Sequence, residues 1–233
     1  MADFPHIPFT LRDFDAQSRL ERGEQFRDWL DQRRSVRFFS DEPVDRRCIE
    51  LAIETASTAP SGAHQQPWTF VAVSDPAIKR EIRIGAEKEE QEFYEGGRAT
   101  DEWLKALGPI GTDSHKPFLE TVPWIVVVFE QTYSSDDEGE RVRHYYTKES
   151  VGIACGLFIA ALHEMGLATL THTPSPMGFL REILHRPSSE RPFIMFPIGR
   201  PTSDCTVPDL RRRSLDEVSV FFDHDPSPAG DHS

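Results

Sequence analysis

The stretch RRSVR occupies residues 33–37, at the end of a segment from near Leu20 to Arg34 in which apolar residues recur at helical spacing. Arginine is planar and permanently charged and can bind a phosphate group through two hydrogen bonds at once, while serine adds a hydroxyl and a backbone donor. The alternative is a helix C-terminus that carries cations suited to the helix dipole. These five residues alone support a phosphate site and a plain helix end equally.

The stretch PSGAHQQPW occupies residues 60–68 and lies between a predicted helix and a predicted strand. Pro60 ends the helix, and Gly62 lacks the Cβ that would keep a planar ligand away from the backbone. His64 and the two glutamines can donate to or accept from the polar edge of a ring. Taken alone, this stretch is more typical of a plain loop before a strand.

Helical and strand patterns alternate along the chain, which predicts an α+β or α/β fold with a central sheet. Helices are predicted over 20–34, from Asp45 as N-cap to a stop before Pro60, from Asp75-Pro76 onward, over 150–165 with Gly166 as C-cap, and over 179–185. Strands are predicted over 68–73, 123–129, 167–171 and 193–198. Residues 135–143 form an acidic connection.

The 233 residues are enough for one large domain, which we place at residues 1–222. Residues 1–19 are rich in Phe and Pro without periodicity, so we expect an extended arm that wraps over another surface. Periodicity also fades over residues 95–117, where glycine and proline recur, and this predicts an active-site lid or a partly disordered segment. Residues 223–233 predict a disordered tail.

The composition argues against several classes of protein. A formal net charge of -13 is unsuited to a nucleic-acid partner, which demands a basic face. The three cysteines lack metal-ligand spacing, and the helical apolar patterns around Cys48 and Cys155 indicate buried free thiols and hence a reducing cytoplasm. The scattered histidines predict no metal site. The first twenty residues contain no uninterrupted apolar run, so neither a signal peptide nor a membrane anchor is expected there.

Several separated segments agree in order and type with one family. RRSVR, SGAHQQPW about twenty-five residues later, and a far C-terminal Arg-rich element resemble the FMN-binding framework of the nitroreductase superfamily. Six longer segments resemble its iodotyrosine deiodinase family, in a form without a membrane anchor: RRSVRFFS (33–40), TAPSGAHQQPWTFV (58–71), EKEEQEFY (87–94), HYYTKESVGIACG (144–156), TLTHTP (169–174) and TVPDLRRRSLDE (206–217). The resemblance implies an α+β fold with a central, mainly antiparallel sheet flanked by helices in an intertwined homodimer.

The resemblance also implies FMN as the cofactor and a role at each matching position. The FMN phosphate and ribityl chain would be held by Arg33, Arg34, Ser35 and Arg212, with Arg37 at the pyrimidine edge of the ring. The partner subunit would contact the flavin through Pro60, Ser61 and Gly62, while Thr171, His172 and Thr173 line the ring near N5 and O4. The Thr173 hydroxyl would bond N5 as the catalytic group; without the family pattern, Thr173 is a plain strand-end threonine.

A set of three polar residues distinguishes a deiodinase from a general nitroreductase. Glu90 and Tyr94 are four apart and share one helix face, and Lys116 lies beyond the glycine-rich segment. The resemblance implies that Glu90 meets the α-ammonium of an amino acid, that Tyr94 and Lys116 meet its α-carboxylate, and that the Ala63 N–H bonds the phenolate. The glutamate run around Glu90 is otherwise typical of a solvated helix face.

The activity that follows from the resemblance is FMN-dependent reductive dehalogenation of halotyrosines, such as iodotyrosine to tyrosine and iodide. The first alternative is a general NAD(P)H-dependent nitroreductase or quinone reductase, which has no need of Glu90, Tyr94 and Lys116. The second is a non-catalytic flavin-binding protein. For the electrons we consider NAD(P)H as a direct donor, or as an indirect one acting through a separate reductase.

Overall fold

The computed structural model describes residues 4–135 and 139–222, and a four-stranded sheet lies at its centre. The strand order is β1 (Trp68–Val73), β2 (Trp124–Gln131), β6 (Glu190–Gly199) and β5 (Ala168–Thr169), and all neighbours pair antiparallel. Strand β2 reads WIVVVFEQ and is buried on both faces, as a near-continuous apolar strand should be. The predicted α+β fold with a mainly antiparallel sheet is confirmed.

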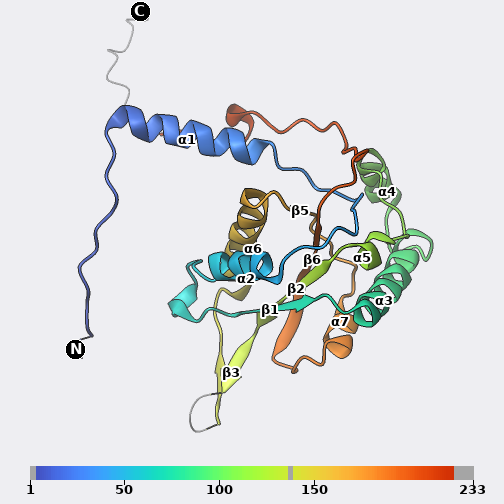
Figure 1. The fold of residues 1–233 in the computed structure, drawn as a ribbon. Helices are drawn as coiled ribbons and strands as arrows, with labels where there is room; N and C mark the ends of the chain where they lie inside the picture. The colour runs from blue at the N-terminus through green and yellow to red at the C-terminus, as the bar shows by residue number, and fades with distance from the viewer. Residues whose placement is uncertain (1–3, 136–138, 223–233) are drawn as a thin grey trace, which may run out of the picture.

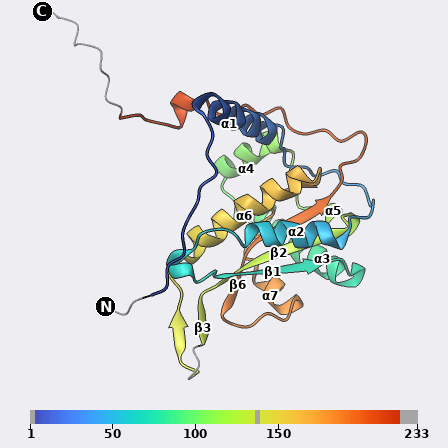
Figure 2. The ribbon, with the colours of Figure 1, turned by 60° about the vertical axis from the view of Figure 1, so that its left-hand side comes forward.

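Helices cover both faces of this sheet (Figure 1). Because successive side chains of a strand point to opposite faces, Val126 and Val128 of β2 pack with α2 (Arg46–Ala56) and α6 (Thr147–Glu164). On the other face, the odd-numbered residues of β2 from Ile125 to Phe129 pack with three helices. These are α3 (Pro76–Tyr94), α5 (Phe118–Thr121) and α7 (Gly178–Ile183). Figure 2 shows the same three layers from a second direction.

The predicted helix boundaries hold where a capping residue marks them. The Asp45 carboxylate accepts a hydrogen bond from the Arg47 N–H at the start of α2, and Asp75 caps α3 with Pro76 in its first turn. Helix α6 begins at Thr147, three residues before the predicted start, because its first turn is polar and gives no apolar signal. Gly166 follows the end of this helix with a φ of +70°.

Other boundaries differ from the prediction. Helix α1 (Ala16–Asp31) starts earlier and ends earlier than predicted, with Asp15 as its N-cap, so RRSVR lies beyond the helix rather than in its last turn. Strand β5 is shorter than the predicted 167–171, whereas β6 is longer than the predicted 193–198. The acidic connection contains two short paired strands, β3 (Tyr133–Ser135) and β4 (Arg141–Arg143).

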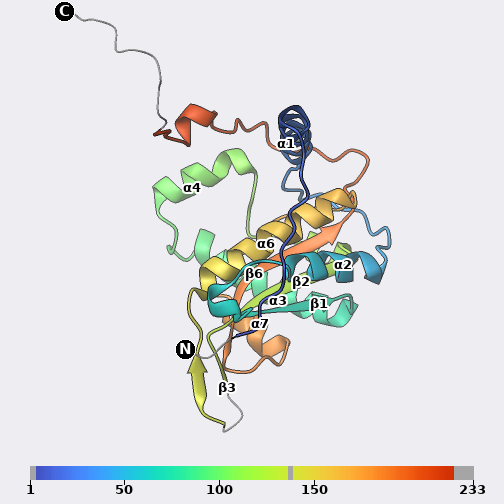
Figure 3. The same ribbon diagram turned by 90° about the vertical axis from the view of Figure 1, so that its left-hand side faces the viewer.

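Residues 95–117 contain regular structure that the sequence pattern did not predict. Helix α4 (Asp101–Leu107) is followed by a single 3-10 turn, η2 (Gly108–Ile110). The Thr100 hydroxyl caps α4 by accepting from the Trp103 N–H. The sequence pattern missed α4 because seven residues are too few to show periodicity. That residues 95–117 act as a lid or are partly disordered stays a prediction. In Figure 3, α4 projects from the body of the molecule.

Both ends of the described chain are extended. Residues 4–14 run away from the body (Figure 1), and their side chains Phe4, Ile7 and Phe9 are 74%, 89% and 85% exposed. Beyond β6, the chain returns along α1 and ends near the short 3-10 turn η3 (Leu215–Glu217). The predicted tail, residues 223–233, lies outside the described residues. Among the described helices, none has the length and apolarity to cross a membrane.

Candidate active site

Arginines from two distant segments line one cavity of about 350 Å³. The first segment is the RRSVR stretch after α1, and the second runs from Pro208 to Arg212 after β6. The cavity therefore brings together all four residues predicted to hold a phosphate: Arg33, Arg34, Ser35 and Arg212. Arg37 and Thr171 complete its wall toward the sheet.

Hydrogen bonds hold these two segments against each other and against the sheet. The Arg212 guanidinium donates to the carbonyl and the carboxylate of Asp31, at 3.0 and 2.7 Å, and to the carbonyl of Arg33 at 2.9 Å. Ser35 forms a parallel bridge with Thr169 of β5, and the Val36 N–H donates to the Thr169 carbonyl. The stretch RRSVR is thus an added edge of the sheet, which fixes the position of its side chains.

The charge in this cavity fits an anionic ligand. Arg33 and Arg37 are half-buried, and no carboxylate of the described chain lies within salt-bridge distance of either. Burial lowers the pKa of both side chains, and the neighbouring Arg212 and Arg34 lower the pKa of Arg33 further. A phosphate, which arginine binds in bidentate fashion, would compensate this concentration of positive charge.

A second cavity, of about 530 Å³, adjoins the first, because Arg37 and Thr171 line both. Its floor is the segment after β5 with Thr171, His172 and Thr173, and its wall is the end of α3 with Glu90 and Tyr94. Aromatic and aliphatic side chains surround these polar groups: Phe93, Trp103, Leu107, Leu170, Met177 and Phe193. The predicted ring-lining residues and the predicted substrate residues of α3 therefore face one space.

Lys116, in the chain beyond α4, contacts residues of this wall without lining the cavity itself, and only 3% of its side chain is exposed. Its Nζ lies 3.6 Å from Oε2 of Glu90 and 5.9 Å from the centre of the Tyr94 ring. It donates to the Thr112 hydroxyl at 3.1 Å and to the Asp113 carbonyl. Glu90, Tyr94 and Lys116, which the resemblance groups as a substrate site, thus lie together. The position of Lys116 in the sequence did not by itself require this contact.

Burial acts on both members of this ion pair. Burial raises the pKa of Glu90 and lowers the pKa of Lys116. The attraction between the two charges shifts each pKa in the opposite direction but offsets the effect of burial only in part. Two poorly hydrated opposite charges of this kind are stabilised by any ligand that brings a partner to each. A zwitterionic amino acid, with an ammonium and a carboxylate on one carbon, is such a ligand.

His172 makes a contact that sequence reasoning missed. Its side chain is 7% exposed, and Nδ1 lies 4.0 Å from Oε1 of Glu90. Burial, together with the charges of Lys116 and Arg37, lowers the pKa of His172 to about 3, so the ring is neutral at physiological pH. No local signal relates His172 to Glu90, because only the packing of α3 on the segment after β5 brings them together.

The loop 60–63 lies apart from both cavities, and none of Pro60, Ser61, Gly62 and Ala63 lines either of them. A Cβ on Gly62 would lie 3.0 Å from the carbonyl oxygen of Tyr145, so within this chain the glycine permits close packing on Tyr145 rather than on a ligand. Ala63 has a positive φ of 50° in the 3-10 turn η1 (Gly62–His64). Within one chain, the loop 60–63 and the two cavities do not form one site.

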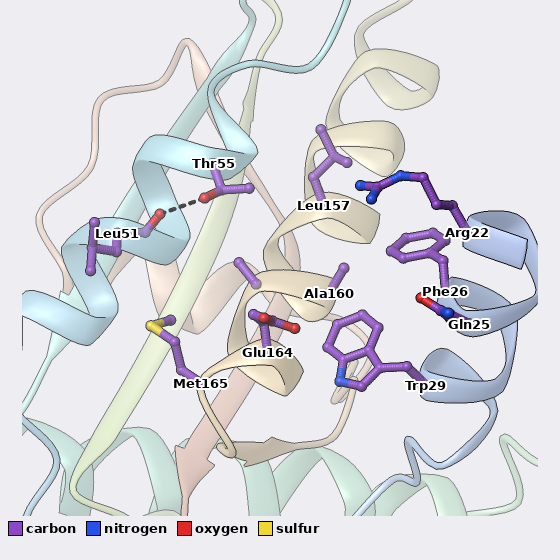
Figure 4. A pocket seen from close by; sticks show the side chains of 11 residues that line it. Arg22, Gln25, Phe26, Trp29, Leu51, Thr55, Leu157, Ala160, Glu164 and Met165 are labelled. Atoms are coloured by element: carbon purple, nitrogen blue, oxygen red, sulfur yellow. Dashed lines mark hydrogen bonds between the residues drawn. The ribbon is translucent and has the colours of Figure 1, made fainter. Parts of the chain in front are cut away.

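A further groove of about 620 Å³ lies between α1, α2 and α6 (Figure 4). Phe26 and Trp29 of α1 face Leu157 and Ala160 of α6 across it, and Leu51 lines it from α2. The groove is mainly apolar and contains none of the predicted site residues. Phe26 and Trp29 belong to the segment whose apolar residues recur at helical spacing, but that pattern did not show that this helix face stays open.

The fold and the two cavities point to one class of protein, which comparison with known proteins identifies. A family model described as Nitroreductase family matches residues 30–200. A crystal structure of oxidized iodotyrosine deiodinase bound to FMN and 3-iodo-L-tyrosine superposes with a TM-score of 0.71 at 29% identity, covering 84% of this chain and 100% of that one. A nitroreductase-like protein from Streptococcus mutans has the same fold, with a TM-score of 0.64 at 19% identity over 87% of this chain and 100% of its own.

Two relatives narrow the assignment. The iodotyrosine deiodinase of Haliscomenobacter hydrossis is 50% identical over 216 residues, which are 93% of this chain and 97% of that protein. Iodotyrosine deiodinase 1 of Homo sapiens is 42% identical over 216 residues, which are 92% of this chain and 74% of the human protein. The chain belongs to the nitroreductase family and, within it, to the iodotyrosine deiodinases.

Proposed function

We propose that this chain is an FMN-dependent oxidoreductase that removes the halogen from halotyrosines, converting iodotyrosine to tyrosine and iodide. The observation that carries the proposal is the junction of two cavities at Arg37 and Thr171. One cavity concentrates arginines for a phosphate, and the other is lined by the largely buried carboxylate of Glu90, with the buried ammonium of Lys116 3.6 Å from it, for a zwitterion. The relatives at 50% and 42% identity are iodotyrosine deiodinases, which supports the same reaction.

Bound FMN supplies the electrons that replace the carbon–halogen bond by a carbon–hydrogen bond. The residues that we assign to its phosphate and ribityl chain are Arg33, Arg34, Ser35 and Arg212. Arg37, which lines both cavities, would face the pyrimidine edge of the ring, where positive charge favours the reduced form. Thr171, His172 and Thr173, which line the second cavity, would line the ring, with the Thr173 hydroxyl toward N5.

The substrate is recognised at both ends of its amino-acid group. Glu90 accepts from the α-ammonium, while Lys116 and Tyr94 donate to the α-carboxylate. Without a ligand, Glu90 and Lys116 attract each other over 3.6 Å. With the ligand bound, Glu90 pairs with its ammonium and Lys116 with its carboxylate instead. Charge-assisted hydrogen bonds in a desolvated site contribute roughly 1.5–3 kcal/mol each. Because the Glu90 and Lys116 side chains are largely buried, these bonds favour an amino acid over a plain phenol.

The active unit is a homodimer, and the partner subunit completes each site. The loop 60–63 lines neither cavity in its own chain, so we assign Pro60, Ser61 and Gly62 to the flavin of the other subunit. The Ala63 N–H donates to no described residue and is free to bond the substrate phenolate there. Apolar surface for such an association is present in the groove of Figure 4 and on the exposed arm.

We further propose a cytoplasmic location, since Cys48, Cys155 and Cys205 are all free thiols, as is usual in a reducing compartment. In that compartment NAD(P)H is available as the source of electrons, directly or through a separate reductase. Residues 95–117, with α4 and η2, form the lid that closes over the substrate, because Trp103, Leu107 and Thr112 line the second cavity.

The test is turnover by the FMN-loaded protein after reduction with dithionite. Iodide release from 3-iodotyrosine is expected, and Glu90→Gln should lower it strongly while reduction of a simple nitroarene continues. Nitroarene reduction without iodide release from the wild-type protein would instead identify a general nitroreductase. Absence of both activities in the reduced, FMN-loaded protein would identify a flavin-binding protein without catalysis.

A further inference from the structure

One buried nitrogen in the second cavity has no hydrogen-bond partner among the described residues: Nε2 of His172. The ring cannot withdraw from the cavity, because the backbone on which it stands is tied to the sheet. The His172 N–H donates to the Met195 carbonyl of β6 at 2.8 Å, and the Met195 N–H donates back at 3.0 Å. A buried polar ring that is fixed in this way calls for an explanation beyond packing.

The other ring nitrogen, Nδ1, faces the carboxylate of Glu90. It lies 4.0 Å from Oε1 of Glu90, while Nζ of Lys116 lies 3.6 Å from the second oxygen of the same carboxylate. Glu90 is therefore flanked by a neutral ring at one oxygen and a cation at the other. The Phe118 ring stands edge-on to the imidazole, with centroids 6.1 Å apart, and limits its movement from the α5 side.

The chemistry of a neutral imidazole decides which nitrogen carries the proton. A carboxylate only accepts hydrogen bonds, so the tautomer with hydrogen on Nδ1 is favoured, and Nε2 keeps a lone pair without a donor. The positive charges of Lys116 and Arg37 and the burial of the ring disfavour the doubly protonated form. A neutral donor can hold Glu90 in place without cancelling the negative charge that an ammonium ligand needs.

We propose that His172 is a positioning residue for substrate selection: its Nδ1–H lies 4.0 Å from Oε1 of Glu90, beyond direct hydrogen-bond distance, and receives this oxygen when Lys116 turns to the ligand, so that the carboxylate stays directed at the α-ammonium of the substrate. Lys116 is then free to turn from Glu90 to the α-carboxylate while the direction of Glu90 is kept. This role rests on the proposed function, because it presupposes that Glu90 receives the ammonium. This role is distinct from a contact between His172 and the flavin, because His172 acts through Glu90 and affects only the ammonium end of the ligand.

The test compares two ligands that differ only in the ammonium group. Binding to the FMN-loaded protein is measured by quenching of flavin fluorescence with 3-fluorotyrosine, whose strong carbon–fluorine bond survives, and with 3-(3-fluoro-4-hydroxyphenyl)propanoate. His172→Leu should weaken the binding of 3-fluorotyrosine roughly tenfold and leave the binding of the propanoate unchanged. His172→Asn, which can place an amide N–H where Nδ1–H stands, should restore most of the binding.

Two further variants keep the test decisive if His172→Leu does not fold. His172→Gln places its amide at the position of Nε2 instead of Nδ1. The His172→Gln protein should therefore bind 3-fluorotyrosine as weakly as a variant without a donor, whereas the His172→Asn protein should bind it well. In a Glu90→Gln background, a second change at His172 should have little further effect, because the two residues act as one unit. Equal binding by the Asn and Gln variants, or additive losses, would contradict the proposal.

The outcomes separate this proposal from the function on which it rests. Equal weakening of both ligands by His172→Leu would show a packing role, and loss of FMN would show a role at the flavin; either result overturns the positioning role alone. A wild-type protein that binds both ligands equally well would overturn the assignment of Glu90 to the ammonium, and with it the role of His172. Iodide release by the wild-type protein measures the proposed activity independently of either result.

Discussion

The arginines around the first cavity differ in what they bind. The Arg212 guanidinium is used by the protein itself, since it donates to Asp31 and to the carbonyl of Arg33. These bonds hold the C-terminal segment to the end of α1 and so set the shape of the cavity. Arg33 and Arg37 have no carboxylate partner in the described chain and are left for an anion. In the proposed site, Arg212 would act on a bound phosphate both by its charge and by fixing the turn beside it.

Arg212→Ala should weaken FMN binding about ten- to a hundredfold, because a charge-assisted hydrogen bond contributes roughly 1.5–3 kcal/mol. Titration of the apoprotein with FMN, followed by flavin fluorescence, measures this affinity. Arg213→Ala is the matched control, because Arg213 is exposed and does not line the cavity. An unchanged affinity for FMN in the Arg212 variant would remove this arginine from the phosphate site.

Thr173→Ala should slow iodide release roughly tenfold, whereas reduction of a nitroarene should persist. A hydroxyl at flavin N5 favours electron transfer in single steps, which cleavage of an aryl–halogen bond requires, and losing one such bond costs about 1 kcal/mol. Thr173→Ser keeps the hydroxyl and should keep most of the rate. If Thr173→Ala releases iodide at the wild-type rate, Thr171 or a backbone donor must hold N5 instead.

At the scale of whole elements, the position of α3 decides the geometry of the substrate site. Glu90 and Tyr94 are near the C-terminal end of this helix, and Gly85 lies one turn earlier against the ring of Phe179 from α7. A Cβ on Gly85 would overlap that ring, so the glycine lets the two helices approach closely. The distance between Glu90 and the segment 171–173 therefore depends on this contact.

Gly85→Ala should destabilise the protein by roughly 1–3 kcal/mol, because Phe179 or the whole of α3 must move. Gly23→Ala in α1 is the matched control, since nothing lies within 4 Å of the added Cβ. It should stabilise by about 0.5–1 kcal/mol, as alanine does in an open helix position. Denaturant unfolding of the FMN-loaded proteins measures both, and the same sign for the two changes would contradict this account.

Helix α4 and its flanks should become ordered over bound substrate. Trp103 of α4 meets Phe93 of α3 edge-on, with centroids 5.0 Å apart, and yet 55% of its side chain is exposed. Arg98 joins the start of the lid to Glu89 and to the Ser175 carbonyl, at 2.9 and 2.8 Å. With few buried contacts, the entropy of the free lid is hard to overcome, so contacts with a ligand must offset it.

Hydrogen exchange of residues 95–117 should therefore slow when iodotyrosine binds to the FMN-loaded protein. Exchange in α6, which is packed against the sheet, should change little and serves as the internal control. The expected effect is confined to the lid and to the segments that it touches. Equal exchange rates of residues 95–117 with and without ligand would show that they do not act as a lid.

At the scale of the whole molecule, the single chain leaves apolar surface uncovered. The arm at residues 4–14 carries four largely exposed apolar residues, and Phe222 at the other end is 98% exposed. Helix α1 buries none of its residues, and the groove beside it is lined by Phe26, Trp29 and Leu157. Exposed apolar surface of this kind is typical of an interface, which agrees with a partner that also supplies the loop 60–63.

The protein should sediment at micromolar concentration with twice the 26.6 kDa mass of the chain and with one FMN in each subunit. Leu51→Glu, which places a charge in the groove, should weaken the dimer and FMN retention together. Ile84→Glu on α3 is the control, because Ile84 is also exposed but lies outside the groove. A monomer that still holds FMN would contradict a shared active site.

The sequence by itself determined the order of the main elements and the family. Capping residues such as Asp45 and Asp75 and the apolar run of β2 act locally, so they can be read without knowledge of the rest of the chain. The motifs at 33–40 and 206–217 pointed to the arginines that the structure brings to one cavity, because those residue types recur in one order along the chain. Short elements such as α4 were missed, since a few residues cannot show a period.

Only the tertiary structure decided which of these residues meet. Glu90, Lys116 and His172 come from three separate segments, and their distances of 3.6 and 4.0 Å result from packing on the sheet. The same packing buries them and so shifts their pKa values, which no residue does alone. It also separates the loop 60–63 from the cavities of its own chain. Contacts between distant segments depend on the whole core, and local pattern does not encode them.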